Sequence, residues 1–227
     1  MKAAAILLAA GRGERMGSEK PKAFLRLGGK PLLRWGVETI EACPDVDAFL
    51  VASPPGQEEQ ARRAARSAKL AAVIGGGATR QDSVRLALGS LPDEFDAVLC
   101  HDVARPLAPA KLFSDVLLPL RSGWGGDGVV PLVPLADSVK RLRPGDRVES
   151  IPRDALHAAQ TPQAFWRTPL AEAHRRAAEQ GHSATDDAEL LEWIGRPVDA
   201  VPGDPKNIKI TRPDDLVLAE ALLRNDG

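Results

Sequence analysis

Short apolar runs alternate with longer amphipathic stretches along the first 135 residues. The apolar runs are typical of buried strands, and they predict strands at residues 2–8, 47–52, 71–74, 96–100 and 128–135. The amphipathic stretches predict helices at residues 31–42, 56–70, 80–91 and 109–120. This alternation predicts an α/β fold, a mainly parallel twisted sheet with helices on both faces.

The alternation is interrupted after residue 135. Two short charged segments, residues 137–143 and 147–151, flank a Pro-Gly-Asp sequence, which predicts a β-hairpin. Because an isolated hairpin is marginally stable in water, we expect it to pack either on the body of the protein or on a second subunit. The alternation then resumes, with helices expected at 169–179, 186–193 and 213–224 and strands near 198–201 and 207–210.

Length and charge narrow the class of protein. The 227 residues are expected to form one domain, and a formal net charge of −1 argues against a nucleic-acid partner. No run approaches the ~18 apolar residues of a membrane span, and we interpret the apolar start as the first strand of a cytoplasmic protein. The cysteines and histidines lack metal-ligand spacing and receive no role: Cys43, Cys100, His157, His174 and His182.

A glycine-rich segment, residues 9–17, follows the first predicted strand directly. Its small residues let the backbone approach a ligand closely, and Arg15 and Lys22 add two positive charges. Backbone N–H groups and cations together suit a nucleoside triphosphate and a reaction at phosphorus, where negative charge must be neutralised. The alternative is an ordinary turn from strand to helix with solvated cations.

The glycine spacing excludes two familiar nucleotide-binding motifs. Glycines at positions 11, 13 and 17 give GxGxxxG, one residue longer than the dinucleotide-binding fingerprint. A P-loop is excluded as well, because the chain contains no GK[ST] sequence.

A second glycine pair, Gly76 and Gly77, lies where a predicted strand leads into a helix that carries Arg80 and Ser83. Backbone N–H groups at such a helix start can bind the edge of a base or a phosphate. The alternative, which is compatible with the first, is that Thr79 caps the helix.

Three other segments carry candidate polar groups. Asp102 at a strand end suits Mg²⁺ beside phosphates, and Arg105 would bind a second phosphate; alternatively these two side chains form an ion pair that closes a turn. Lys209 supplies a third cation if its strand faces the site, and is otherwise an exposed edge-strand lysine. Thr185 belongs to a helix cap or meets a substrate hydroxyl. Ligands of parallel sheets bind outside the carboxyl ends of the strands, where the glycine segments and Asp102 are expected.

Together these segments resemble the 2-C-methyl-D-erythritol 4-phosphate cytidylyltransferases of the non-mevalonate isoprenoid pathway. The resemblance covers nearly the whole chain, in order, and depends on AAGRGERMG with PK, GGATRQDSV, HDVARP, PLADSVK, TPQAF, TDDA and NIKIT. The first motif alone indicates only the wider sugar-nucleotidyltransferase group, with its Rossmann-like fold. The HDVARP, TPQ and NIKIT motifs make the resemblance specific.

The resemblance implies a reaction in which CTP and methylerythritol 4-phosphate, with Mg²⁺, give 4-diphosphocytidyl-methylerythritol and pyrophosphate. It implies that Arg15 and Lys22 stabilise the transition state, that Arg153 and Lys209 orient the methylerythritol phosphate, and that Asp102 binds the metal and the substrate hydroxyls. The cytidine portion would be held by Ala9, Ala10, Gly11, Gly76 and Ser83. The physics of the reaction agrees, because two anions must meet, and an ionised phosphomonoester needs no general base.

The family's hairpin arm, here at about 137–153, crosses to a twofold partner. The resemblance therefore implies a homodimer in which Ser138 and Arg153 serve the neighbouring subunit's site. Ser138 stands where threonine is expected, and it keeps the hydroxyl.

Two other functions stay open. One is a nucleotidyltransferase that acts on another polyol or sugar phosphate, or uses another base. The other is a nucleotide-binding module without catalysis, against which the set of cations and Asp102 argues.

Overall fold

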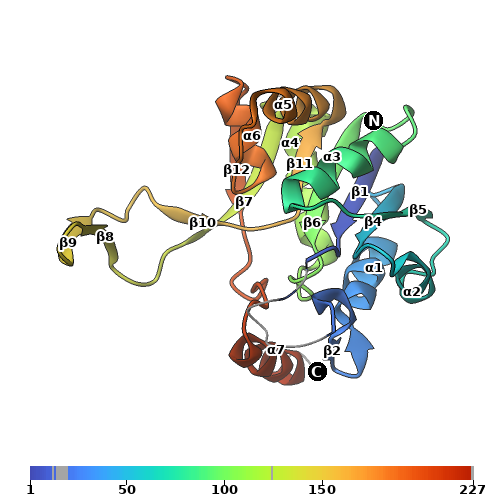
Figure 1. The fold of residues 1–227 in the computed structure, drawn as a ribbon, viewed down its shortest axis with the longest axis horizontal. Helices are drawn as coiled ribbons and strands as arrows, with labels where there is room; N and C mark the ends of the chain where they lie inside the picture. The colour runs from blue at the N-terminus through green and yellow to red at the C-terminus, as the bar shows by residue number, and fades with distance from the viewer. Residues whose placement is uncertain (12, 14–19, 124, 226–227) are drawn as a thin grey trace.

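The computed structural model describes residues 1–11, 13, 20–123 and 125–225. In this part of the chain, eight strands form the central sheet (Figure 1). Seven of them follow the order β10 (His157–Ala159), β7 (Gly128–Pro134), β11 (Gln163–Trp166), β6 (Ala97–Asp102), β1 (Ala3–Leu8), β4 (Ala48–Ser53) and β5 (Leu70–Gly75). The eighth strand, β12 (Val198–Pro202), pairs in parallel with β7. Only β10 and β11 run antiparallel to their neighbours in this sheet, which confirms the expectation of a mainly parallel fold.

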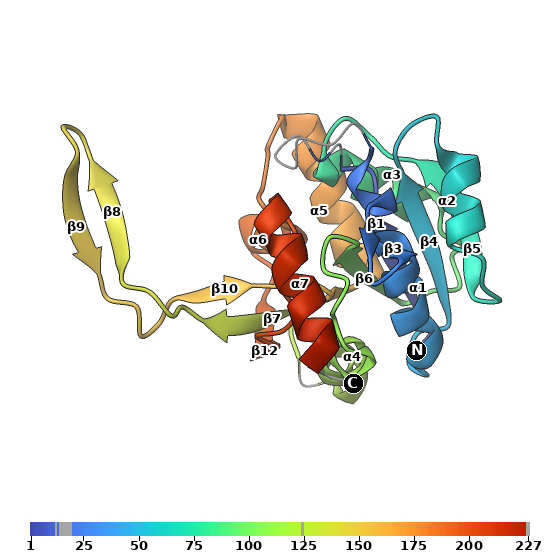
Figure 2. The same cartoon turned by 90° about the horizontal axis from the view of Figure 1, so that it is seen from below.

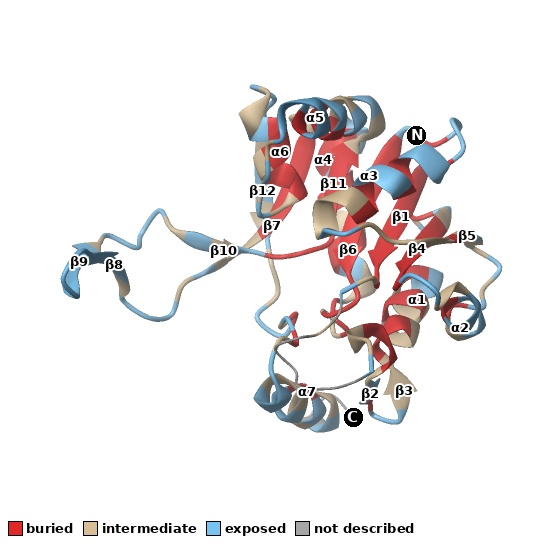
Figure 3. Cartoon of the chain, in the orientation of Figure 1, coloured by how far each residue is buried: buried red, intermediate tan, exposed pale blue. Residues whose placement is uncertain are grey.

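Helices cover both faces of the sheet. One face is packed against α1 (Leu32–Ala42), α2 (Glu58–Ala64) and α4 (Ala110–Ser122), and the other against α3 (Arg80–Ser90), α5 (Arg167–Gln180) and α6 (Asp187–Trp193). All six residues of β1 are buried, because alternate side chains join the two opposite cores. Figure 3 shows this burial concentrated in the central strands.

The order of the strands reverses beside β1. The chain passes from β1 through α1 to β4 on one side, and later enters β6 on the other side of β1. The carboxyl ends of β1 and β6 lie in register, with Leu8 opposite Asp102. Such a reversal leaves a crevice outside the strand ends, where ligands of α/β sheets bind.

A small third core packs beside this crevice. The short 3₁₀ helix η2 (Lys22–Phe24) and strands β2 (Arg26–Leu27) and β3 (Lys30–Pro31) lead into α1, and the final helix α7 (Pro213–Asn225) packs near them. The buried side chains of this third core are Leu27, Leu32, Ile210 and Ala219. Among the described helices, none is long and apolar enough to cross a membrane.

Two predicted elements differ from the structure, and two strands of the central sheet were missed. Residues 207–210 are not a strand: Ile208 and Ile210 pack in the third core, and their alternation reflects that packing rather than strand pairing. Helix α2 ends at Ala64, not at residue 70, because Leu70 already pairs with β4 as the first residue of β5. Strands β10 and β11 were not predicted, since both are short and pair with distant segments.

The predicted hairpin is present and stands away from the sheet (Figures 1 and 2). Strands β8 (Val139–Arg143) and β9 (Arg147–Ile151) pair antiparallel. Gly145 and Asp146 between them have φ of 75° and 58°, a region that glycine and aspartate tolerate better than most residues. Leu142 and Val148 lie opposite each other and are 69% and 67% exposed, so the arm buries no core of its own.

Candidate active site

A cleft of about 770 Å³ opens at the carboxyl ends of β1 and β6. Residues from segments far apart in the sequence line it, among them Ala9, Ala10, Gly11, Lys22, Gly76, Gly77, Arg80, Ser83, Asp102 and Lys209. The structure therefore brings together most of the predicted site residues at the position where the strand order reverses. Arg15 lies outside the described residues.

Glycines form the wall of the cleft between β1 and α3. A Cβ at Gly76 would lie 2.3 Å from the Cβ of Ala10, and a Cβ at Gly77 would lie 2.3 Å from the Cβ of Asp82. Neither position has room for a side chain, so the backbone itself forms the surface that a ligand would meet.

The start of α3 is capped as predicted. The hydroxyl oxygen of Thr79 accepts a hydrogen bond from the backbone N–H of Asp82, 3.0 Å away. The Ser83 hydroxyl accepts from the N–H of Gly77 and donates to the carbonyl of Thr79. The predicted cap is therefore confirmed, and the same turn lines the cleft, while binding of a base or a phosphate by its backbone stays a prediction.

Asp102 is the one carboxylate among the described residues that line the cleft. It is 7% exposed, and its two oxygens pair with Arg80 Nε at 3.0 Å and Lys209 Nζ at 2.6 Å. Burial alone would raise the pKa of Asp102, but the charges of Arg80 and Lys209 outweigh burial and hold that pKa well below its usual range. Asp102 is therefore ionised at neutral pH.

The two lysines of the cleft come from adjoining segments. Lys22 Nζ donates a hydrogen bond to the carbonyl oxygen of Ile210, 2.9 Å away, which ties the segment after β1 to the segment that carries Lys209. Asn207, fully buried, fixes the same segment through a hydrogen bond to the carbonyl of Thr161, 2.9 Å away. The cations predicted from distant motifs thus share one wall of the cleft.

Arg105 makes other contacts than the two predicted for it. Its guanidinium donates to the carbonyls of Asn207 and Ala159, at 2.8 and 3.2 Å. Asp102 pairs with Arg80 and Lys209 instead, so the alternative of an Asp102–Arg105 ion pair is wrong. The structure places Arg105 beside the cleft, where it cross-links the loops.

Thr185, Ser138 and Arg153 do not line the cleft of their own chain. The hydroxyl and N–H of Thr185 donate to Glu189 at the start of α6, the capping role predicted for this segment. Ser138 and Arg153 are exposed at the base of the arm, where the Arg153 guanidinium donates to the carbonyl of Ala136.

Sequence reasoning missed two buried residues behind the cleft. Arg80 Nη1 donates to Asp187 at 2.7 Å, and Asp187 in turn meets His174 Nε2 at 3.0 Å. The only clue in the sequence was the acidic pair of the TDDA motif, which helix capping explained sufficiently. The contact between Arg80 and Asp187 joins residues 107 positions apart, and that between His174 and Asp187 joins two different helices, so no local pattern predicts either.

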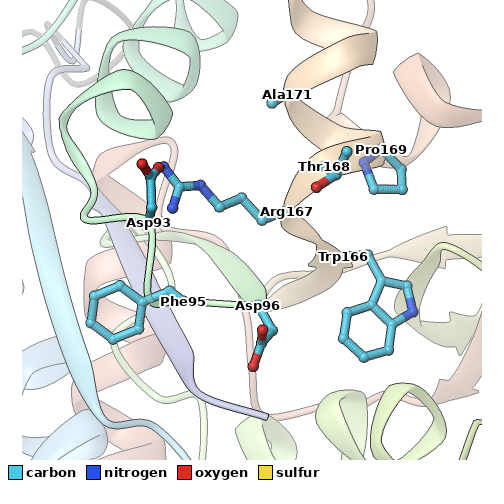
Figure 4. Close-up of a pocket in the computed structure, with 8 residues that line it drawn as sticks. All are labelled: Asp93, Phe95, Asp96, Trp166, Arg167, Thr168, Pro169 and Ala171. Atoms are coloured by element: carbon cyan, nitrogen blue, oxygen red, sulfur yellow. The ribbon is translucent and has the colours of Figure 1, made fainter.

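A second hollow, of about 570 Å³, lies at the opposite end of β6 (Figure 4). Asp96 just before β6 and Trp166 at the end of the antiparallel β11 both line it, and Arg167 pairs there with Asp93 at 2.9 Å. Ligands of α/β sheets bind at the carboxyl ends of parallel strands. Its position therefore favours the larger cleft as the active site.

Known proteins resemble this chain over almost its full length. The family model for 2-C-methyl-D-erythritol 4-phosphate cytidylyltransferase matches residues 3–225. The proteins of that name from Frankia casuarinae and Streptomyces coelicolor are 45% and 42% identical, covering 97% and 99% of this chain and 80% and 87% of their own.

Solved structures show the same relationship. The Thermus thermophilus 2-C-methyl-D-erythritol 4-phosphate cytidylyltransferase superposes with a TM-score of 0.80 at 38% identity, covering 99% of this chain and all of its own. The Anaerococcus prevotii 4-diphosphocytidyl-2C-methyl-D-erythritol synthase gives 0.87 at 28% identity, covering 98% and 96%. The fold, the cleft and these relatives lead to one conclusion: the chain belongs to the 2-C-methyl-D-erythritol 4-phosphate cytidylyltransferase family.

Proposed function

We propose that this chain transfers the cytidylyl group of CTP to 2-C-methyl-D-erythritol 4-phosphate, in isoprenoid precursor biosynthesis. The products are 4-diphosphocytidyl-2-C-methyl-D-erythritol and pyrophosphate. One observation carries the proposal: Lys22, Asp102 and Lys209, from three distant motifs, line the same cleft beside a wall of bare backbone.

The reaction joins two anions. A phosphate oxygen of methylerythritol phosphate bonds to the α-phosphorus of CTP, and the bond from that phosphorus to the pyrophosphate oxygen breaks. Lys22 and Arg15 neutralise the negative charge that develops on the phosphoryl oxygens. The backbone of residues 9–11 and 76–77 binds the cytidine portion, and no base is required because the attacking phosphate is already ionised.

Lys209 orients the acceptor. Its ammonium group pairs with Asp102 in this structure, and the Lys209 side chain is 40% exposed, so an incoming phosphate can reach it. Asp102 then accepts hydrogen bonds from the hydroxyl groups of the acceptor. Arg80 contributes a fixed positive charge at the wall of the cleft. Contacts of Arg105 and Thr185 with substrate stay predictions.

The residues of the cleft fit a magnesium ion. Within the described part of the chain, no group of three or more histidines, cysteines, aspartates or glutamates gathers to form a site made of protein ligands alone. A single ionised carboxylate, Asp102, completed by substrate oxygens and water, is the set that Mg²⁺ prefers. When bound, the ion would neutralise triphosphate charge.

The active unit is a homodimer in this proposal. The arm at residues 137–153 carries exposed apolar side chains at Leu142 and Val148 and belongs to none of the three cores that the described residues form. A second copy would cover these side chains and bring Ser138 and Arg153 to a neighbouring cleft, where the serine hydroxyl replaces the expected threonine.

The test is pyrophosphate release from CTP and methylerythritol 4-phosphate, with and without Mg²⁺. ATP, GTP and UTP, and other polyol phosphates, serve as controls. Turnover that requires CTP and this acceptor supports the proposal. Turnover with another pair points to a related nucleotidyltransferase, and CTP binding without pyrophosphate release from any acceptor points to a binding module; either result overturns the proposal.

A further inference from the structure

A chain of buried charged groups extends from the cleft into the protein. Asp102 at the end of β6 pairs with Arg80, the first residue of α3, and the same guanidinium pairs with Asp187, the first residue of α6. His174 of α5 contacts Asp187 and is the last of these buried groups. Side-chain contacts thus connect strand β6 with the three helices α3, α5 and α6 on one face of the sheet.

Asp187 is shielded from solvent almost completely. Asp187 and His174 are both 1% exposed. Burial would raise the pKa of Asp187, but the charge of Arg80 and the hydrogen bond from His174 lower it to about 2. An ionised carboxylate only accepts hydrogen bonds, so His174 donates to it through Nε2.

Arg80 is the only described cation that pairs with both carboxylates. The thiol of Cys100 also faces Asp187. Burial raises the pKa of this thiol, so it is neutral, and Arg80 compensates the negative charge of Asp187. The guanidinium is held in two directions, by Asp102 at Nε and by Asp187 at Nη1, at 3.0 and 2.7 Å. A long arginine side chain held at only one of these points has free rotamers, and it would no longer fix the carboxylate of Asp102.

We propose that Asp187 is a positioning residue of the reaction. Oriented by His174, it fixes the guanidinium of Arg80, and Arg80 then holds one oxygen of Asp102 while the other oxygen faces Lys209 and the cleft. Asp187 itself lies behind Arg80 and is not part of the cleft lining. This inference rests on the proposed function, because its readout is the transfer reaction.

The central test is Asp187→Asn, which keeps the shape and removes the charge. We expect kcat to fall by about 10- to 100-fold, because the carboxylate at the reacting centre loses its fixed orientation. KM for CTP should stay within about 2-fold, since the backbone that holds the cytidine portion is untouched. A merely structural role would lower the folded fraction and leave kcat per folded enzyme unchanged.

The matched control is Asp186→Asn, one residue earlier. Asp186 caps α6 and accepts from Gln163 Nε2 at 2.8 Å, so it belongs to the same turn without touching Arg80. Asparagine caps helices as well as aspartate does. This variant should therefore keep the kcat of the unaltered protein.

A double-mutant cycle tests the route of the effect. If Asp187 acts through Arg80, adding Asp187→Asn to an Arg80→Gln protein should lower kcat by less than about 2-fold further. A full additional loss of 10-fold or more would overturn the proposal. So would a kcat for Asp187→Asn equal to that of the unaltered protein.

Should Asp187→Asn not fold, Asp187→Glu keeps the charge and displaces the carboxylate by one methylene. The proposal then expects kcat to fall at least about 3-fold with KM for CTP unchanged, and an unchanged kcat overturns it. Turnover by the unaltered protein separates the two hypotheses. If that protein fails to release pyrophosphate, the proposed function fails; if it turns over and the variants do too, only the role of Asp187 fails.

Discussion

Replacing Gly76 by alanine tests whether the bare backbone wall is needed. The new methyl carbon would lie 2.3 Å from the Cβ of Ala10, 3.0 Å from the Oγ of Ser83 and 3.1 Å from the carbonyl oxygen of Ser53. Neither the Ala10 Cβ nor the Ser53 carbonyl can swing aside, because the first is bonded to the backbone and the second belongs to it.

The magnitude follows from these distances. Carbon atoms in contact lie ~3.5–4.0 Å apart, so the segment after β1 and the segment after β5 must separate by roughly 1 Å. The separation also strains the hydrogen bond from the Gly76 N–H to Ser53 O, now 2.8 Å. Overpacking of this kind costs about 1–3 kcal/mol, and a displacement of ~1 Å in an active site can lower the rate by about 100-fold.

The assay combines kinetics and thermal unfolding. We expect Gly76→Ala to lower kcat/KM for CTP by about 100-fold and Tm by roughly 2–12 °C, at 2–4 °C per kcal/mol for a chain of this size. The matched control is Gly89→Ala in the last turn of α3, where an added Cβ meets nothing within 4 Å. It should stabilise the helix by up to about 1 kcal/mol and leave the kinetics unchanged.

Two results would refute the reasoning. If Gly76→Ala keeps the kcat/KM and Tm of the unaltered protein, the two segments separate freely and the wall is not rigid. If Gly89→Ala loses as much activity as Gly76→Ala, an added methyl group lowers activity even where it meets no close neighbour, and the loss in Gly76→Ala does not come from the closely packed wall of the cleft.

The other predictions concern the cations, the arm and acid stability. Lys22→Ala should lower kcat by roughly 100- to 1,000-fold with a modest loss of stability, as measured by pyrophosphate release, because a charge-stabilising group is removed; full turnover would contradict that role. Lys22→Ala and Arg153→Ala proteins, each nearly inactive, should regain roughly a quarter of normal activity when mixed and allowed to exchange subunits, because one cleft of each mixed dimer is intact. If mixing restores nothing, Arg153 does not serve the partner's cleft. Because the pKa of Asp187 is lowered from 3.8 to about 2, its stabilisation is complete above about pH 4 and is lost as the pH falls towards 2. The free energy of unfolding, measured in urea, should therefore fall by ~2 kcal/mol over that interval, and it should fall less in Asp187→Asn. Identical pH profiles for the two proteins would contradict the assignment.

Local patterns predicted the elements whose stability depends on local features. The run Ala3–Leu8 is apolar throughout because β1 is covered on both faces. Thr79 was recognised as the cap of α3 because the cap and the N–H that it binds are three residues apart. The hairpin was recognised from its turn residues, and the structure confirms it.

Patterns failed where distant contacts decide the outcome. The alternation at 207–210 comes from two isoleucines that pack in the third core, and no strand in the described part of the chain pairs with them. Strands β10 and β11 exist because β6 and β7 supply their hydrogen-bond partners. The alternative of an Asp102–Arg105 ion pair was wrong, because carbonyls from two distant loops bind the guanidinium of Arg105 and Asp102 pairs with Arg80 and Lys209.

The sequence by itself determined the α/β class, the order of most elements, and the segments that carry phosphate-binding chemistry, because periodicity, glycines and caps act over a few residues. Only the tertiary structure decided that Lys22, Asp102 and Lys209 share one cleft, and that Arg80 connects Asp102 to Asp187. The physical reason is that an ion pair in a protein interior depends on which helices and strands pack together, and that packing is set by the whole chain.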